Sequence, residues 1–183
     1  MKVVNHRLES ESVVHLQTPN CDQRPDGEDI SLLVIHNITL PPGEFGGTFV
    51  QDFFMNQLDY EAHPFFKEIQ SLKVSSHLFI RREGELIQFS GFDQRAWHAG
   101  LSSFGHRTNC NDFSIGIELE GTDDHPYTDQ QYEVLKQVTL CLQKAYPRIT
   151  KDRIVGHQDI APGRKTDPGP SFDWDRYLNG INA

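Results

Sequence analysis

Hydrophobic and polar positions change their period several times along the chain, which predicts both strands and helices. Residues 31–36, SLLVIH, form a short continuous apolar run with β-branched residues, as in a buried strand. Residues 113–121, FSIGIELEG, alternate instead. The apolar residues at positions 115, 117 and 119 face one side of a strand, while Gly116, Glu118 and Glu120 face the other.

Other stretches predict one hairpin, one further strand and several helices. We expect the hairpin over residues 75–90 and the strand over residues 153–157. Thr128 and Gln131 resemble a capping box, and an apolar stripe at helical spacing follows them until Pro147. Shorter helices are expected at three places: after a cap at Thr48, from His63, and over residues 173–178.

These elements indicate one α/β domain with a central mixed β-sheet flanked by helices. The length of 183 residues agrees with a single domain. Residues 1–30 are polar and rich in turns, and we expect them to form an N-terminal arm packed on the domain of residues 31–183.

Composition and charge narrow the range of partners. A net charge of −9 argues against nucleic acid, although a local basic cluster can still bind an anionic small substrate. No apolar run reaches the roughly 18 residues that a membrane span needs. The N-terminal sequence lacks a secretory signal pattern, and the three cysteines form no C-x-x-C pair. We therefore expect a cytoplasmic monomer that acts on a small molecule.

Two histidines and one aspartate form a candidate metal site. His36 and His157 each end a predicted strand, at the carboxyl end where α/β folds gather their sites. Asp167 precedes Pro168, which favours extended backbone and holds the carboxylate in a stiff loop. Two imidazoles and one carboxylate can bind zinc with an open fourth position, which suits hydrolysis. Because the three residues are scattered, an ordinary surface turn around Asp167 is the alternative.

Three other residues are candidates with equally simple alternatives. Lys165 lies two residues before Asp167, so both side chains point into one cleft if the stretch is extended. Glu118 lies on the polar side of its strand and could shuttle a proton, or it could simply face solvent. Trp97, in RAWHAG (95–100), could line a peptide or sugar groove or belong to the core.

Four stretches together resemble the AmpD-type N-acetylmuramoyl-L-alanine amidases: IHNITLPPGEFGG, RAWHAG, CNDFSIGIELEGTD and GHQDIAPGRKTDPGPSFDW. The resemblance runs from about Asp22 to Tyr177. It implies a zinc enzyme that hydrolyses the amide between the lactyl group of (1,6-anhydro-)N-acetylmuramic acid and L-alanine of the stem peptide. It also implies a role in cytosolic peptidoglycan recycling, and so control of the muropeptide signals that induce β-lactamase.

The resemblance also assigns roles to individual residues. It implies His36, His157 and Asp167 as zinc ligands, Glu118 as the catalytic glutamate and Lys165 as the lysine that stabilises the transition state. Positions that line the substrate groove fall on Asn37, Trp97, His98, Lys73 and Arg107.

One of these positions departs from the family pattern. Lys73 stands where family members carry arginine. Because lysine is a point charge and not a bidentate clamp, we expect looser recognition of the distal peptide. The sequence HRTNC around Arg107 differs as well, which weakens the assignment of that residue.

Three alternatives stay open at this level. A non-catalytic peptidoglycan-binding module of the same fold would have lost a zinc ligand, whereas all three are present here. An envelope or phage-type amidase would digest intact cell wall. A structural zinc site would use a fourth protein ligand, and none is obvious in the sequence.

Overall fold

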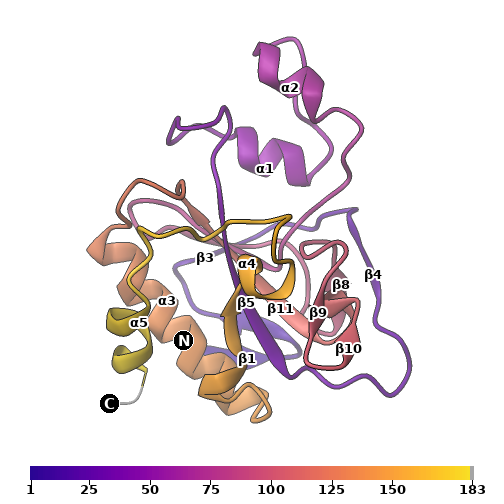
Figure 1. Cartoon of the computed structure of the whole chain (residues 1–183), viewed down its shortest axis with the longest axis vertical. Helices are drawn as coiled ribbons and strands as arrows, with labels where there is room; N and C mark the ends of the chain where they lie inside the picture. The colour runs from indigo at the N-terminus through magenta and orange to yellow at the C-terminus, as the bar shows by residue number, and fades with distance from the viewer. Residues whose placement is uncertain (182–183) are drawn as a thin grey trace.

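A six-stranded mixed sheet in the order β12-β5-β11-β6-β7-β3 forms the centre of the computed structural model, which describes residues 1–181 (Figure 1). The strands β12, β5, β11 and β6 are parallel, and β7 runs antiparallel to β6. The predicted α/β class with a mixed sheet is therefore confirmed. The six strands are β3 (Val13–His15), β5 (Leu32–Ile38), β6 (Leu78–Ile80), β7 (Leu86–Gln88), β11 (Ser114–Glu120) and β12 (Ile154–Gly156).

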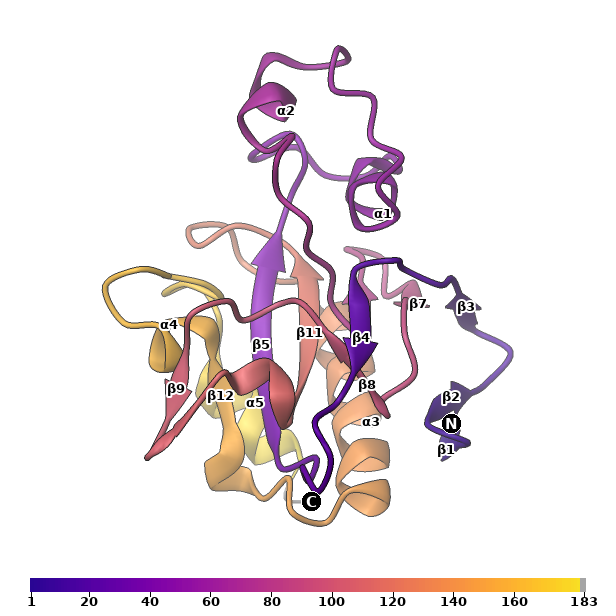
Figure 2. The same cartoon turned by 90° about the vertical axis from the view of Figure 1, so that its right-hand side faces the viewer.

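The two faces of the sheet have different covers. Odd-numbered residues of β5 and β11, such as Ile35 and Ile117, pack against the apolar stripe of α3 (Asp129–Ala145) and against α5 (Trp174–Gly180) (Figures 1 and 2). The predicted capping box starts α3. Even-numbered Leu32 and Val34 pack on the other face, against residues from loops and from α4 (His157–Ile160). The even positions farther along both strands are thus free to build a polar site.

Two short helices stand beyond the carboxyl ends of the central strands (Figure 2). These are α1 (Phe49–Phe54) and α2 (Pro64–Glu68), whose aromatic residues pack with Phe79 and Phe89. Thr48 precedes α1, but its hydroxyl donates to Asp52 at 2.7 Å and caps no backbone amide. The predicted cap is wrong because the backbone of Thr48 is already helical, whereas a capping residue is extended. No helix within residues 1–181 is both long and apolar enough to cross a bilayer.

The N-terminal segment is tied into the domain by strand pairing. β1 (Lys2–Val4) pairs with β2 (Arg7–Glu9), and β3 forms the edge of the central sheet beside β7. β4 (Cys21–Gln23) pairs with β8 (Gln94–Ala96). Residues 1–30 therefore lie along the domain and also contribute one strand to its sheet. The remaining elements are β9 (Ser103–Phe104), β10 (Arg107–Thr108) and the 3₁₀ helices Cys110–Asp112 and Lys151–Arg153.

Arg24 fastens the end of this segment to the loops that lie over the sheet. Its side chain is buried, and its guanidinium donates to the carbonyl oxygens of Phe92, Asn111, Asp112 and Ser114 at distances between 2.7 and 3.0 Å. Burial lowers the pKa of Arg24 to about 10, which leaves it charged at neutral pH. One cation thus satisfies four backbone acceptors, one in the loop between β7 and β8 and three at or just before the start of β11.

We expect Arg24→Ala to lower the free energy of unfolding by about 3 kcal/mol or more, because four buried carbonyl groups lose a charged donor. Urea denaturation monitored by circular dichroism measures this. Lys2→Ala is the control, since the Lys2–Glu9 ion pair is exposed and should change stability by at most about 0.5 kcal/mol. Equal effects of the two substitutions would show that Arg24 does not fasten the segment.

Candidate active site

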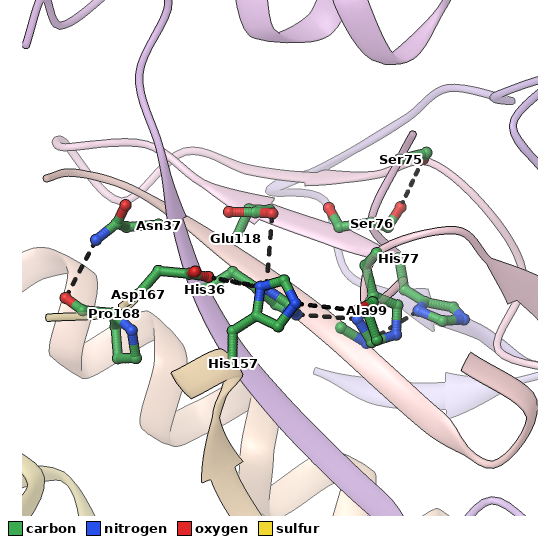
Figure 3. Close-up of polar contacts among 12 residues, drawn as sticks. His36, Asn37, Ser75, Ser76, His77, Ala99, Glu118, His157, Asp167 and Pro168 are labelled. Carbon is green, nitrogen blue, oxygen red and sulfur yellow. Dashed lines mark hydrogen bonds and ion pairs between the residues drawn. The ribbon is translucent and has the colours of Figure 1, made fainter. Parts of the chain in front are cut away.

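Three potential metal ligands converge at the carboxyl ends of β5 and β12 (Figure 3). His36 lies near the end of β5, His157 directly follows β12, and Asp167 comes from the loop after α4. His36 Nδ1 is 2.9 Å from His157 Nδ1 and 3.1 Å from Asp167 Oδ2. His157 Nδ1 is 3.0 Å from the same carboxylate oxygen. The structure therefore brings together the three residues that the sequence predicts as ligands.

The size and access of this triangle fit a catalytic metal ion. With bonds of about 2.0–2.1 Å, neighbouring ligand atoms around tetrahedral zinc lie about 3.3 Å apart. The histidines are buried, whereas 14% of the Asp167 side chain stays exposed, so the cluster opens on one side. Within residues 1–181 it is the one group of at least three His, Cys, Asp or Glu side chains arranged to hold a metal.

Hydrogen-bond partners and burial set the protonation of the ligands. His157 Nε2 is 3.1 Å from the carbonyl oxygen of Ala99, so Nε2 donates and Nδ1 presents its lone pair to the cluster. Burial lowers the pKa of His36 to about 4, which keeps that ring neutral. Burial alone would raise the pKa of Asp167, but its polar contacts with His157 and His36 outweigh that effect and hold the pKa well below its usual range. Neutral imidazoles and an ionised carboxylate are the forms that bind metals.

The loop that carries Asp167 is fixed against β5. Asn37 Nδ2 donates to Asp123 Oδ1 at 2.9 Å and to the carbonyl oxygen of Pro168 at 3.1 Å. Gly169 has φ +80°, and a Cβ there would lie 2.2 Å from the Cα of Asp123. Only glycine fits this close approach in a left-handed conformation. The loop is therefore held in place next to the strand that carries His36.

Glu118 lies beside the ligand cluster because β11 pairs in register with β5. It is the direct neighbour of His36, and its Oε1 is 4.0 Å from His36 Nδ1. The side chain is buried, and its Oε2 has no hydrogen-bond partner among residues 1–181. Burial, together with the charge of Asp167, raises the pKa of Glu118 well above its usual value, while Lys165 opposes the shift. A carboxylate with a free acceptor atom thus stands next to the ligand atoms.

A cleft of about 600 Å³ leads to this cluster. Asn37, Lys165 and Asp167 line one part of it, and Arg164 lies next to Lys165. The facing wall is apolar and comes mainly from α1, α2 and the loop before them, with the residues Leu40, Pro42, Phe53, Phe65 and Ile69. The role of these apolar residues in lining the cleft was not predicted from the sequence, because apolar residues at helical spacing are equally typical of core packing.

The other residues that we predicted to contact the substrate are not among those that line this cleft. Trp97 is half-buried, and its backbone bonds to Asn20 and Ser75. Lys73 is exposed in the segment between α2 and β6. The guanidinium of Arg107 pairs with Glu28 and Asp29 and stacks 3.6 Å from the centre of the Phe113 ring. Substrate contacts of Trp97, Lys73 and Arg107 stay predictions.

His98 lies behind the cluster and does not line the cleft. Its ring is buried, and its Nδ1 is 2.9 Å from His36 Nε2. Burial lowers the pKa of His98 well below its usual value, and the neighbouring histidines act in the same direction. Its predicted contact with substrate stays a prediction, whereas its contact with His36 is observed.

Glu118→Gln should stabilise the metal-free protein at neutral and higher pH. The raised pKa means that the folded state holds a proton on Glu118 more tightly than the unfolded chain does. The stability from this group is present below the unfolded pKa and is lost as pH rises through the folded pKa. Glutamine removes that loss, so the variant should gain about 1 kcal/mol or more at pH 8 and little at pH 5. Urea unfolding of the metal-free proteins measures it, and an equal difference at both pH values would contradict the assignment.

Known proteins resemble this chain over nearly its whole length. The sequence profile of the family described as N-acetylmuramoyl-L-alanine amidase matches residues 26–170. The 1,6-anhydro-N-acetylmuramyl-L-alanine amidase AmpD of Haemophilus influenzae is 55% identical over 166 residues, covering 91% of this chain and 90% of that protein.

Two solved structures agree. A selenomethionine AmpD derivative superposes with a TM-score of 0.95 at 52% identity and covers 99% of both chains. AmpDh3 of Pseudomonas aeruginosa, solved in complex with an anhydromuramic pentapeptide, has a TM-score of 0.61 at 30% identity and covers 85% of this chain and 61% of that one. With its fold, its ligand cluster and these matches in agreement, the chain belongs to the N-acetylmuramoyl-L-alanine amidase family.

Proposed function

We propose that this protein is a zinc-dependent amidase. In this proposal it hydrolyses the bond between the lactyl group of 1,6-anhydro-N-acetylmuramic acid and L-alanine of the stem peptide. The observation that carries the proposal is the convergence of three ligand atoms and an unpartnered buried carboxylate oxygen beside one cleft. The AmpD relative bears this substrate in its name, and the Pseudomonas relative was solved with an anhydromuramic pentapeptide. The proposal includes a cytosolic role in peptidoglycan recycling, the setting that the family resemblance implies.

The donor set defines what the metal would contribute. His36 and His157 would bind through Nδ1 and Asp167 through Oδ2, because these atoms converge. Two nitrogens and one oxygen match a catalytic zinc site. Bound there, zinc supplies a Lewis acid that acidifies water and polarises a carbonyl group.

Glu118 is the group that moves the proton. Its Oε2 has no hydrogen-bond partner within residues 1–181, so this carboxylate oxygen can accept a proton as a general base. Glu118 takes the proton from the attacking water and later gives it to the nitrogen of L-alanine as the amide bond breaks. The amine then leaves as a neutral group.

Lys165 is the group that stabilises the developing negative charge. It lines the cleft together with Asp167, and its charge opposes the raised pKa of Glu118 and lowers the pKa of His36. A fixed ammonium at this place favours an amide oxygen that becomes negative in the transition state.

The direct test is hydrolysis of an anhydromuramyl tripeptide, followed by chromatography, before and after dialysis against a chelator. We expect about one zinc per chain, loss of hydrolysis on chelation and recovery when zinc is added. Intact peptidoglycan serves as the comparison substrate. Undiminished hydrolysis by metal-free protein would contradict the zinc mechanism, and cleavage of intact peptidoglycan alone would favour an envelope or phage-type amidase.

Lys165→Ala should lower kcat by about 10²–10³ while zinc content stays at the wild-type level, because the lysine acts on the transition state and not on the metal. Steady-state kinetics and metal analysis of the same preparation measure this. Lys144→Ala is the matched control, since Lys144 is an exposed residue in the last turn of α3 and is not among the residues that line the cleft. A Lys165 variant with unchanged kcat would remove this residue from the mechanism.

A further inference from the structure

His36 can bind a metal through Nδ1 only if its hydrogen stays on Nε2. For His157 the matching condition is met by the backbone, because the Ala99 carbonyl oxygen can only accept. The Nε2 atom of His36 has a different partner, the Nδ1 atom of His98 at 2.9 Å. Because a ring nitrogen can donate or accept, the tautomer of His36 depends on the tautomer of His98.

His98 in turn contacts Ser114. The Nε2 atom of His98 is 3.0 Å from Ser114 Oγ. If His98 donates to Ser114, its Nδ1 is an acceptor and takes the hydrogen bond from His36 Nε2. If Ser114 donates instead, the relay reverses and the hydrogen of His36 moves to Nδ1, which faces His157 and Asp167. Only the first direction leaves the lone pair of His36 pointing at the metal position.

The polar side of β11 is built around the His98 ring. Ser114, Gly116 and Glu118 are successive residues on that side, and all three are buried. A Cβ on Gly116 would lie 2.5 Å from His98 Cγ, so the glycine leaves the space that the ring fills. Strand β11 thus supplies, in sequence order, the Ser114 hydroxyl as a hydrogen-bond acceptor, the space over Gly116 for the ring, and Glu118 as the candidate base.

The backbone at His98 is fixed as firmly as its ring. The amide N–H groups of His98 and Ala99 both donate to Asn111 Oδ1, at 3.1 and 2.8 Å. The dipeptide then contacts both ligand histidines, His36 through the His98 ring and His157 through the Ala99 carbonyl oxygen. Asn111 therefore sets the position of both contacts.

We infer that His98 is a positioning residue that holds His36 in its Nε2–H tautomer and so directs Nδ1 to zinc. This role is separate from substrate contact and rests on the zinc site of the proposed function. Groups that orient metal-ligating histidines typically contribute about 10- to 100-fold to metal affinity.

The test compares two substitutions of similar size. Asn at position 98 offers a carbonyl oxygen two bonds from Cβ, as Nδ1 is, whereas Leu offers no acceptor. His98→Leu should weaken zinc binding about 10- to 100-fold, and His98→Asn should restore most of it. Competition with a chromophoric zinc chelator gives the affinities, and melting of the metal-free proteins checks that both variants fold. His106→Leu is the control, because His106 is exposed in the turn between β9 and β10.

Two outcomes of this comparison overturn the inference. One is wild-type affinity in folded His98→Leu, and the other is an equal loss in both variants, which would mean that the ring only fills space. A wild-type protein that binds no zinc would instead refute the proposed function. The two failures are therefore distinguishable without any activity measurement.

Nuclear magnetic resonance of the unsubstituted zinc protein provides a second test. With ¹⁵N-labelled histidine, His36 should show a protonated Nε2, a metal-bound Nδ1 and a scalar coupling from Nε2 to the Nδ1 of His98 across the hydrogen bond. A hydrogen on the Nδ1 of His98, or zinc on the Nε2 of His36, would overturn the inference even if both substitutions unfold the protein.

Discussion

The site depends on the parallel pairing of β5 with β11. The register places Glu118 directly beside His36, on the face of the sheet opposite α3 and α5, and His157 follows β12, which pairs with β5 on its other side. A shift of one residue in the register of either strand would turn its polar side chain toward the hydrophobic core beneath α3, because successive side chains of a strand point to opposite faces. The apolar residues at the odd positions hold the register, and the site at the even positions inherits its geometry from them.

Polar groups buried in this way destabilise the fold unless each is given a partner. The carboxylate of Asp167 lies 3.1 Å from His36 Nδ1 and 3.0 Å from His157 Nδ1, and His157 Nε2 donates to a backbone carbonyl oxygen. Among residues 1–181 the Oε2 atom of Glu118 has no hydrogen-bond partner, and burial raises the pKa of Glu118. Glu118, the buried polar group with the fewest compensating hydrogen bonds, is thus also the group that transfers the proton in the proposed chemistry. This is expected where function opposes stability.

Local sequence patterns predicted much of the fold and the ligand set, for reasons that are visible in the structure. Period-two alternation in β11 and the capping box of α3 are local signals, and both are confirmed. His36 lies near the carboxyl end of β5 and His157 follows β12, the parallel neighbour of β5, so their convergence follows from the parallel topology. Glu118 and Lys165 were candidates from their positions near Gly116 and Asp167, and the family resemblance assigned their catalytic roles, since a glutamate on the polar side of a strand has no local mark of burial.

Long-range contacts escaped the sequence. From the sequence alone, Arg24 is one charged residue in a polar segment. In the structure it donates to four backbone carbonyl groups far along the chain. His98 reads as part of a possible substrate groove, although its ring lies over Gly116 and behind His36. The prediction of a cap at Thr48 was wrong. The residue type determines which hydrogen bonds a side chain can form, whereas the backbone angles determine where the side chain points.

In the proposed mechanism three residues hold the metal, while Glu118 transfers the proton from the attacking water to the leaving nitrogen. The most direct measurement is zinc stoichiometry and steady-state kinetics of Glu118→Gln on one preparation. The account predicts about one zinc per chain and a kcat lowered by about 10²–10⁴ with KM little changed, because a general base acts in the transition state. A wild-type kcat, or a variant that no longer binds zinc, would contradict this division of roles.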